Sequence, residues 1–279
     1  MKKSTLVSKM FDMKGRVAVI TGAAGLLGPK HAESLAEFGA NIVLLDRKPA
    51  VQKIAAAIAR KYKVKAIGLK CDITQKSELE KTLKIILKKF GHIDVLVNNA
   101  ANNPAVSAGG FSQNWSRLEN FPLSAWEDDV AVGLTGAFLA SQVFGSQMAT
   151  QKKGVIVNIA SDLGIIAPDQ RIYRKEGLPP EQQSVKPVTY SVIKHGMLGL
   201  TKYLASYWAE SGVRVNAISP GGVYTNQPRD FVKKLARHVP LHRMAHTDEY
   251  KAAIAFLSTD ASEYMTGANL VVDGGRTIW

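Results

Sequence analysis

The sequence predicts an α/β fold in which a doubly wound, seven-stranded parallel sheet lies between two layers of helices. Short runs of β-branched and aliphatic residues alternate with longer amphipathic stretches along the chain, and this alternation is typical of strand–helix–strand units. The short runs are almost continuously apolar, as expected for parallel strands that are buried on both faces. With 279 residues and 46% hydrophobic composition, we expect residues 1–279 to form a single domain.

The elements follow in order from these runs and the turn-forming residues between them. The predicted strands are Arg16–Gly22, Ala40–Asp46, Val64–Cys71, Ile93–Asn98, Gly154–Ala160, Val213–Ser219 and Leu270–Asp273. The predicted helices are Gly25–Phe38, Ala50–Tyr62, Gln75–Phe90, Ser124–Ala149 and Val188–Ser211. Two stretches, 168–187 and 223–246, show no strong periodicity. We expect them to be insertions, because long loops in compact domains usually serve a function.

Two helix starts carry capping signals. Ser124 and Glu127 match a capping box, in which the two side chains satisfy free backbone N–H groups. Thr247 is expected to cap a further helix. Asp248 and Glu249 follow it directly, and acidic side chains suit the positive end of a helix.

Composition and charge limit the classes of function. The single cysteine, Cys71, excludes an intramolecular disulfide and is typical of a reducing compartment; we expect a small buried side chain at a strand end. The first 13 residues contain no apolar stretch of signal length, and no run reaches the roughly 18 residues of a membrane span. We therefore expect a cytoplasmic protein without a membrane partner. The formal charge of +13 fits a solvated surface or an anionic partner, but no nucleic-acid module accompanies it.

A glycine-rich turn lies between the first strand and the first helix, in the segment TGAAGLLG that begins at Thr21. Gly22, Gly25 and Gly28 permit a tight turn and a close approach of backbone to a pyrophosphate, which the N-terminus of the helix then favours. In this strand–turn–helix context the motif predicts dinucleotide binding on a Rossmann-type, three-layer α/β/α fold.

Two carboxylates end the second and third strands. Asp46 lies 18 residues beyond Gly28, where a carboxylate binds both hydroxyls of the adenosine ribose and repels a 2′-phosphate. This favours NAD over NADP, although Arg47 follows directly and can weaken the preference. Asp72 either reaches the adenine amino group or caps the next helix beside Thr74.

A tyrosine and a lysine stand four residues apart on the predicted helix Val188–Ser211. At this spacing Tyr190 and Lys194 share one helix face. A lysine ammonium beside a phenol favours the phenolate and lowers the pKa of the tyrosine. Such a tyrosine can exchange a proton near neutral pH while a hydride moves.

Taken together, these motifs resemble those of the short-chain dehydrogenase/reductase family, from Gly15 to Gly275. The matching segments are TGAAGLLG from Thr21, Asp46, CDI from Cys71, NNAA from Asn98, NIAS ending at Ser161, YSVIK from Tyr190, RVNAISPGGV from Arg214 and VVDGG from Val271. The resemblance, which is to the single-domain branch, implies an NAD-dependent oxidoreductase acting on a secondary alcohol or ketone.

The resemblance also implies roles for individual residues. Tyr190 is the acid/base, Lys194 tunes it and holds the nicotinamide ribose, and Ser161 binds the reacting oxygen. The implied cofactor contacts are Gly22, Gly25, Leu27, Gly28, Asp46, Arg47, Asp72, Ile73, Asn99, Ala100, Tyr190, Lys194, Pro220, Gly221, Val223 and Thr225. Asn98 is expected to be structural, and no metal is expected.

Three features depart from the family pattern. Leu26 replaces the middle glycine of the turn, and the resulting spacing resembles a longer branch that modifies sugar nucleotides. Gly133 stands where most members have an asparagine that helps to hold a water leading from the lysine to solvent, so we expect a changed proton relay. Ser161 and Tyr190 are 29 residues apart, a longer gap than usual, and the extra residues fall within 168–187.

Basic residues in the two insertions suggest an anionic substrate, because convergent cations attract a carboxylate or phosphate. They are Arg171, Arg174, Lys175, Arg229, Lys233, Lys234, Arg237 and Arg243. The hypothesis is a polyol or sugar acid similar to those taken by gluconate-type reductases of the family; the alternative is that these charges only face solvent. His238, His242 and His246 are four apart, but Pro240 interrupts them and nothing completes a metal-ligand set.

Other functions remain open at this point. One is a dehydratase or epimerase that retains its NAD, favoured by the glycine spacing and disfavoured by chain length. Another is a dinucleotide-binding regulator with weakened chemistry, for which Gly133 is the main support. Family members also assemble as tetramers or dimers through the two long helices, so a homo-oligomer is expected; Tyr203, Tyr207 and Trp208 suit either such an interface or the core.

Overall fold

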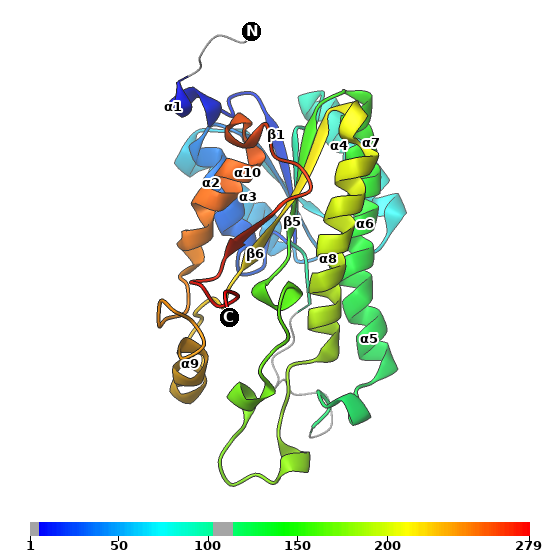
Figure 1. Cartoon of the computed structure of the whole chain (residues 1–279). Coiled ribbons are helices and arrows are strands. Elements are labelled where there is room, and N and C mark those ends of the chain that lie inside the picture. The colour runs from blue at the N-terminus through cyan, green and yellow to red at the C-terminus, as the bar shows by residue number, and fades with distance from the viewer. Residues whose placement is uncertain (1–5, 103–113) are drawn as a thin grey trace.

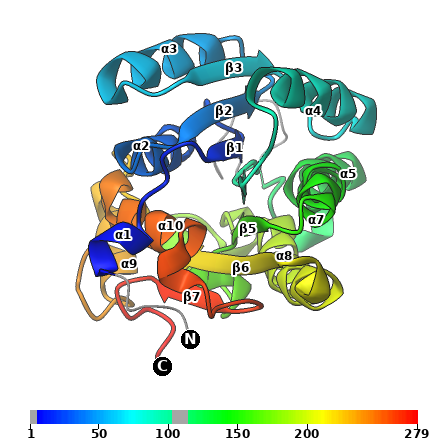
Figure 2. The same ribbon diagram turned by 90° about the horizontal axis from the view of Figure 1, so that it is seen from above.

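Seven parallel strands form one sheet in the order β3-β2-β1-β4-β5-β6-β7 (Figures 1 and 2). The structure is a computed structural model that describes residues 6–102 and 114–279. The strands are β1 (Val17–Thr21), β2 (Asn41–Asp46), β3 (Ala66–Lys70), β4 (Val95–Asn98), β5 (Gly154–Ile159), β6 (Val213–Pro220) and β7 (Asn269–Val272). The chain winds outward from β1 to β3, returns to β4 and continues to β7. The predicted doubly wound, Rossmann-type sheet is confirmed.

Helices cover both faces of this sheet (Figure 2). One face carries α2 (Gly28–Glu37), α3 (Ala50–Tyr62) and α10 (Lys251–Ser258), and the other carries α4 (Lys76–Phe90), α5 (Leu123–Val130), α6 (Gly136–Ala140), α7 (Ser146–Thr150) and α8 (Val188–Tyr207). The short α1 (Val7–Met10) and α9 (Arg229–Ala236) lie outside these layers. In the described part of the chain, no helix combines the length and the apolarity needed to cross a membrane.

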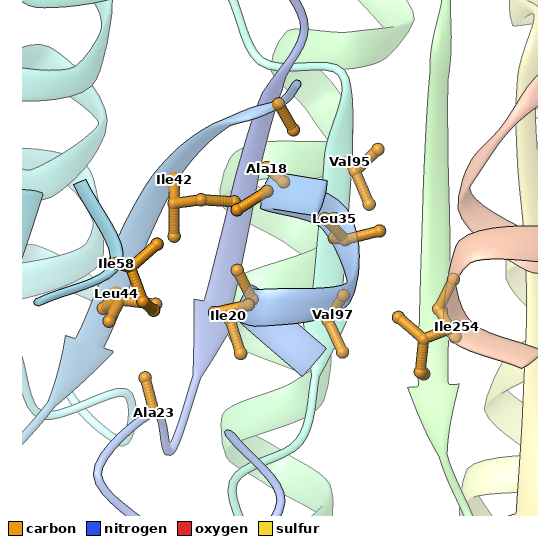
Figure 3. Packing of buried hydrophobic residues seen from close by; sticks show 14 of the residues in the cluster. Ala18, Ile20, Ala23, Leu35, Ile42, Leu44, Ile58, Val95, Val97 and Ile254 are labelled. Carbon is orange, nitrogen blue, oxygen red and sulfur yellow. The ribbon is translucent and has the colours of Figure 1, made fainter. Parts of the chain in front are cut away.

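Each face of the sheet packs a separate hydrophobic core, because successive strand residues point to opposite sides. Ala18 and Ile20 of β1 join Leu35 of α2 in one core (Figure 3), whereas Val17 and Val19 join the other. These side chains are completely buried, and burying a valine, leucine or isoleucine side chain contributes about 1.5–3 kcal/mol. The two cores fix the sheet, and all strands point their carboxyl ends to one edge.

Three predicted helix starts were wrong. The first helix begins at Gly28, three residues later than predicted, so that Gly22 and Gly25 of the glycine turn precede it. α5 begins at Leu123 after Pro122, and Ser124 makes no capping bond because it already lies within the helix. At the third start, which leads into α10, His246 takes the cap position in place of Thr247. The backbone N–H of His246 donates to the Glu249 carboxylate at 2.8 Å.

The long helix predicted at Ser124–Ala149 is interrupted by two π-helical turns, Ala131–Thr135 and Ser141–Gly145. π-Turns of this kind often mark functional sites, and the first contains Gly133. The predicted helix Val188–Ser211 is confirmed as α8, with its last residues, Ala209–Ser211, forming a 3₁₀ turn.

The two stretches without strong periodicity, 168–187 and 223–246, pack against each other at the carboxyl edge of the sheet (Figure 1). Residues 168–187 contain 3₁₀ turns at Gln170–Tyr173 and Pro180–Gln182, and residues 223–246 contain α9. The rings of Tyr173 and Phe231 lie 5.5 Å apart, centre to centre. The Nζ of Lys234 donates to the backbone oxygen of Arg174 at 2.8 Å. The helix α9 was not predicted.

Candidate active site

A cavity of about 690 Å³ follows the carboxyl edge of the sheet, where ligands of open α/β sheets bind. Its walls include every predicted catalytic and cofactor-binding residue except Gly28. Its size lies within the range of small-molecule and cofactor sites. The structure therefore brings together residues from seven separate segments of the chain.

The glycine turn lies at one end of this cavity. Gly22 has a φ of +62°, and a Cβ there would lie only 2.6 Å from the Cα of Ala100. The Asn99 amide holds the same turn, donating to the backbone oxygens of Thr21 and Gly22 at 3.0 Å each. A Cβ at Gly28 would instead lie 2.6 Å from the Cα of Ala23, so glycine here allows the start of α2 to pack closely on Ala23.

The two strand-end carboxylates differ in their surroundings. Asp46 lines the cavity and accepts hydrogen bonds from the backbone N–H groups of Ala24 and Lys48, at 2.9 Å each. It thus fastens the glycine turn to the end of β2. Asp72 accepts from the N–H and the hydroxyl of Thr74, at 3.0 and 2.8 Å. This local turn precedes α4, whose cap residue is Gln75 and has no side-chain capping bond, so Asp72 does not cap the helix. Its side chain lines the cavity.

Ser161, Tyr190 and Lys194 converge at the other end of the cavity. The Tyr190 hydroxyl lies 3.5 Å from Ser161 Oγ, a long hydrogen bond of the kind that tightens in substrate complexes. Lys194 is buried and donates from Nζ to the backbone oxygen of Ile159 at 2.7 Å. Its Nζ lies 5.7 Å from the centre of the Tyr190 ring.

The pKa of Tyr190 does not follow the expected direction. Burial, the largest cause, raises the pKa of this phenol, and the hydrogen bond with Ser161 opposes it. Burial also lowers the pKa of Lys194 to about 8, and the charge of Lys186 acts in the same direction. The expected lowering of the tyrosine pKa by Lys194 was therefore wrong for this geometry.

Sequence reasoning missed three charged residues in the cavity wall. Asp162 and Arg276 form a buried ion pair at 2.7 Å. The Nζ of Lys186 lies 4.0 Å from the centre of the Tyr190 ring, and burial lowers the pKa of this lysine to about 8. Asp162 adjoins Ser161, and Lys186 is four residues from Tyr190, but no local pattern identifies partners separated by 114 residues.

The space next to Gly133 is filled by the side chain of Ile193. A Cβ at Gly133 would lie 2.8 Å from Cγ2 and 3.2 Å from Cδ1 of Ile193. Ile193 immediately precedes Lys194 and is itself buried. An asparagine therefore cannot be accommodated at residue 133 without moving Ile193, whose apolar side chain fills the space next to Gly133.

The eight basic residues inferred from sequence to bind an anion do not converge on the cavity. None of the eight cations named above lines it. Arg171 pairs with Asp169 at 2.8 Å and Arg243 with Glu249 at 2.6 Å. Arg229, Lys233 and Arg237 line a separate, open hollow beside α9. His238 lies near Asp169, whereas His242 faces this hollow.

Two predictions about single residues are confirmed. Cys71 is buried directly after β3. Asn98 is a buried strand-end residue whose amide donates to Asn158 at 2.8 Å and to Ser141 at 2.9 Å, and it ties β4 to β5 instead of facing the cavity.

The fold and this cleft define a dinucleotide-binding α/β oxidoreductase. Residues 16–173 match the family model described as short chain dehydrogenase, and residues 181–277 match one described as Enoyl-(Acyl carrier protein) reductase. The chain belongs to the short-chain dehydrogenase/reductase family, and the predicted enzyme class is confirmed.

Individual relatives align over nearly the whole chain. An NAD-dependent glycerol dehydrogenase from Listeria innocua is 34% identical over 97% of both chains. An NADP-dependent mannitol dehydrogenase from Alternaria alternata is 31% identical over 99% of this chain and 97% of its own. The crystal structure of a gluconate 5-dehydrogenase from Burkholderia cenocepacia, in complex with NADP and tartrate, is 27% identical, with a TM-score of 0.83 over 98% of this chain and all of the other.

Proposed function

We propose that this protein is an NAD-dependent oxidoreductase that transfers a hydride between the nicotinamide and a secondary alcohol or ketone of a polyhydroxylated compound. The observation that carries the proposal is the convergence of Ser161, Tyr190 and Lys194 at one end of a cavity whose other end is the glycine turn. The nicotinamide, when bound, supplies or accepts the hydride.

The protein's own groups handle the proton and the substrate oxygen. Tyr190 exchanges a proton with that oxygen, and Ser161 holds it by a hydrogen bond. Lys194, fixed to Ile159, places its ammonium beside the phenol and holds the nicotinamide ribose. On the nucleotide side, the glycine turn receives the pyrophosphate. Pro220, Gly221, Val223 and Thr225 from the end of β6 and the following loop contact the nicotinamide half.

Asp46 supports the choice of NAD over NADP. Its carboxylate lines the cavity, at the end of β2 where the adenosine ribose binds in such folds. A fixed negative charge there attracts hydroxyl groups and repels a phosphate. Arg47 and Lys48 line the same end of the cavity, so the preference is expected to be finite.

The substrate we propose is an anionic polyol or a sugar acid. Lys186 and Arg276 bring two cations into the cavity wall near Tyr190, against the carboxylate of Asp162. Lys186 is the contact proposed for the anionic group, replacing the loop cations inferred from sequence. Glycerol and mannitol dehydrogenases among the relatives and a gluconate 5-dehydrogenase support a hydroxyl-rich compound.

The test is a screen with NAD against polyols, sugar acids and simple alcohols, following NADH. A dehydrogenase accumulates NADH with at least one compound, whereas an NAD-retaining epimerase or dehydratase converts substrate without net NADH. Tyr190→Phe is expected to lower kcat about 100- to 10,000-fold while NADH binding, measured by fluorescence, is retained. A regulator lacking chemistry gives no turnover in either protein, and that result overturns the proposal.

We also propose that the protein assembles as a homo-oligomer through α5–α7 and α8. Tyr203 and Tyr207 of α8 are 64% and 66% exposed and stack at 5.9 Å, whereas Trp208 is buried in the core. Phe138 of α6 and Val192 of α8 are also exposed. Sedimentation of the wild type and of Tyr203→Glu tests this assembly, and a monomeric wild type refutes it.

A further inference from the structure

A buried carboxylate–guanidinium pair lies beside Ser161, and none of the steps proposed above uses it. Asp162 Oδ2 accepts a hydrogen bond from Arg276 Nη1 at 2.7 Å. The two side chains are only 4% and 7% exposed, yet both line the cavity. Burying two charges costs free energy unless their hydrogen bonds are well satisfied. Because apolar side chains could fill the same space, the presence of this ion pair calls for a functional explanation.

The same carboxylate accepts a hydrogen bond from the hydroxyl of Ser161. Ser161 Oγ lies 2.7 Å from Asp162 Oδ1, and an ionised carboxylate only accepts hydrogen bonds. A serine hydroxyl has a single proton to donate. While that proton points to Asp162, Ser161 cannot donate to the oxygen of a substrate. Asp162 Oδ1 also accepts from the backbone N–H of Leu163 at 2.8 Å, so a substrate hydroxyl that replaces the serine on this oxygen leaves the carboxylate fully hydrogen-bonded.

We propose that the Asp162–Arg276 pair binds a second hydroxyl, on the carbon next to the one that reacts, and that the enzyme therefore selects vicinal diols and their α-hydroxyketone products. This hydroxyl donates to Asp162 Oδ1 and accepts from Arg276. Because it is both donor and acceptor, it matches a carboxylate next to a guanidinium. The inference rests on the proposed dehydrogenase function and specifies its substrate.

The geometry explains why the second hydroxyl must be adjacent. The reacting oxygen lies between Tyr190 and Ser161, and Asp162 Oδ1 is within hydrogen-bond distance of the same serine. Two oxygens on neighbouring carbons can reach these two positions together. When the second hydroxyl takes the place of Ser161 on Asp162, the serine proton turns to the reacting oxygen. An isolated alcohol leaves the serine donor engaged.

The experiment compares matched probes with and without the second hydroxyl. Initial rates with NAD are measured for cis-1,2-cyclohexanediol against cyclohexanol and for 2,3-butanediol against 2-butanol. In the wild type we expect kcat/KM to be at least about 100-fold higher for each diol, because sites built to bind a hydroxyl reject analogues that lack it. Equal values for diols and mono-alcohols overturn the inference while leaving the dehydrogenase function standing. If neither these probes nor the wider screen yields NADH, both the inference and the dehydrogenase function are overturned.

A variant separates substrate contact from simple support of the fold. Asp162→Ala combined with Arg276→Met removes both charges, so no lone charge is buried. We expect the preference for diols to fall to within about threefold of unity, because kcat/KM for the diols falls much further than kcat/KM for the mono-alcohols. A purely structural pair lowers both classes together, which contradicts the inference.

Two controls accompany this variant. Asp260→Asn with Arg16→Met removes another Asp–Arg pair, at 2.5 Å and outside the cavity, and should leave the preference unchanged. NADH binding by fluorescence verifies that each variant is folded. If the double variant does not fold, Arg276→Lys retains the ion pair but loses the guanidinium geometry, and its diol preference should fall by about tenfold or more.

Discussion

The contact between Gly133 and Ile193 permits a prediction whose sign depends on one neighbouring side chain. In an ordinary helix, Gly→Ala stabilises a protein by up to about 1 kcal/mol, because alanine has the higher helix propensity. At Gly133 the added Cβ would lie 2.8 Å from Ile193 Cγ2. Isoleucine in a helix has one strongly preferred χ1 rotamer, so this methyl group cannot simply rotate away.

Gly133→Ala should therefore destabilise the protein. Overpacking of a core costs about 1–3 kcal/mol, and after the propensity gain we expect a net loss of about 1 kcal/mol. Ile193→Ala removes the obstructing atoms and itself costs about 2–5 kcal/mol. In that background Gly133→Ala should instead stabilise by about 1 kcal/mol, which gives a coupling energy of about 2 kcal/mol between the two positions.

Urea unfolding of the four proteins at one protein concentration measures this coupling. A Gly133→Ala substitution that stabilises both backgrounds equally would show that Ile193 does not close this space. The same proteins report on the proton path, since Gly133→Asn with Ile193→Ala restores the family's asparagine. If the Ile193 side chain next to residue 133 alters the path by which a proton leaves, that variant should shift the pH profile of kcat relative to Ile193→Ala.

Three further predictions concern the cofactor, the substrate and stability. Asp46→Ser should lower the ratio of kcat/KM for NAD to that for NADP by about tenfold, equivalent to roughly 1.4 kcal/mol; an unchanged ratio contradicts the role given to Asp46. Lys186→Met should lower kcat/KM for a sugar acid by about 10- to 100-fold, as for a lost hydrogen bond to a charged group, and have much less effect on a neutral polyol; equal losses exclude an anion contact. Burial lowers the pKa of His31 from 6.5 to about 4, although a contact with the Asn99 side chain acts in the opposite direction. The folded state thus binds fewer protons than the unfolded state between these values, so stability should fall by roughly 3 kcal/mol as pH falls from 6.5 to 4, and His31→Leu should flatten this dependence in urea unfolding.

Features that depend on local sequence were predicted well. The apolar runs gave all seven strands to within two residues at each end, because a strand buried on both faces has little tolerance for polar residues. The glycine turn and the pair Tyr190 and Lys194 were found for a similar reason, since backbone conformation and helical spacing are local properties. Helix starts were predicted less well, because Pro122 and His246 determined them in place of the Ser and Thr side chains.

Features that depend on contacts between distant segments were not predicted. The pKa of Tyr190 is dominated by burial, which spacing alone does not reveal. The eight basic residues singled out in 168–187 and 223–246 looked convergent in sequence, but none of them lines the cavity. Their place in the cavity wall is taken by Lys186 and Arg276, and neither belongs to a recognisable motif.

The C-terminal glycine pair explains how Arg276 reaches Asp162, the neighbour of Ser161. Gly274 and Gly275 have φ values of +69° and +90°, a backbone conformation that other residues rarely adopt. Asp273 secures the turn, accepting from the N–H groups of Gly275 and Thr277 at 2.8 Å each. A Cβ on either glycine would lie within 2.8 Å of Val239 or Pro240, so the second insertion packs directly on this turn. The segment VVDGG, which by sequence indicates only a strand and a tight turn, thereby directs Arg276 from the last strand back to Asp162, and a larger residue at either glycine should disturb substrate selection before it disturbs the sheet.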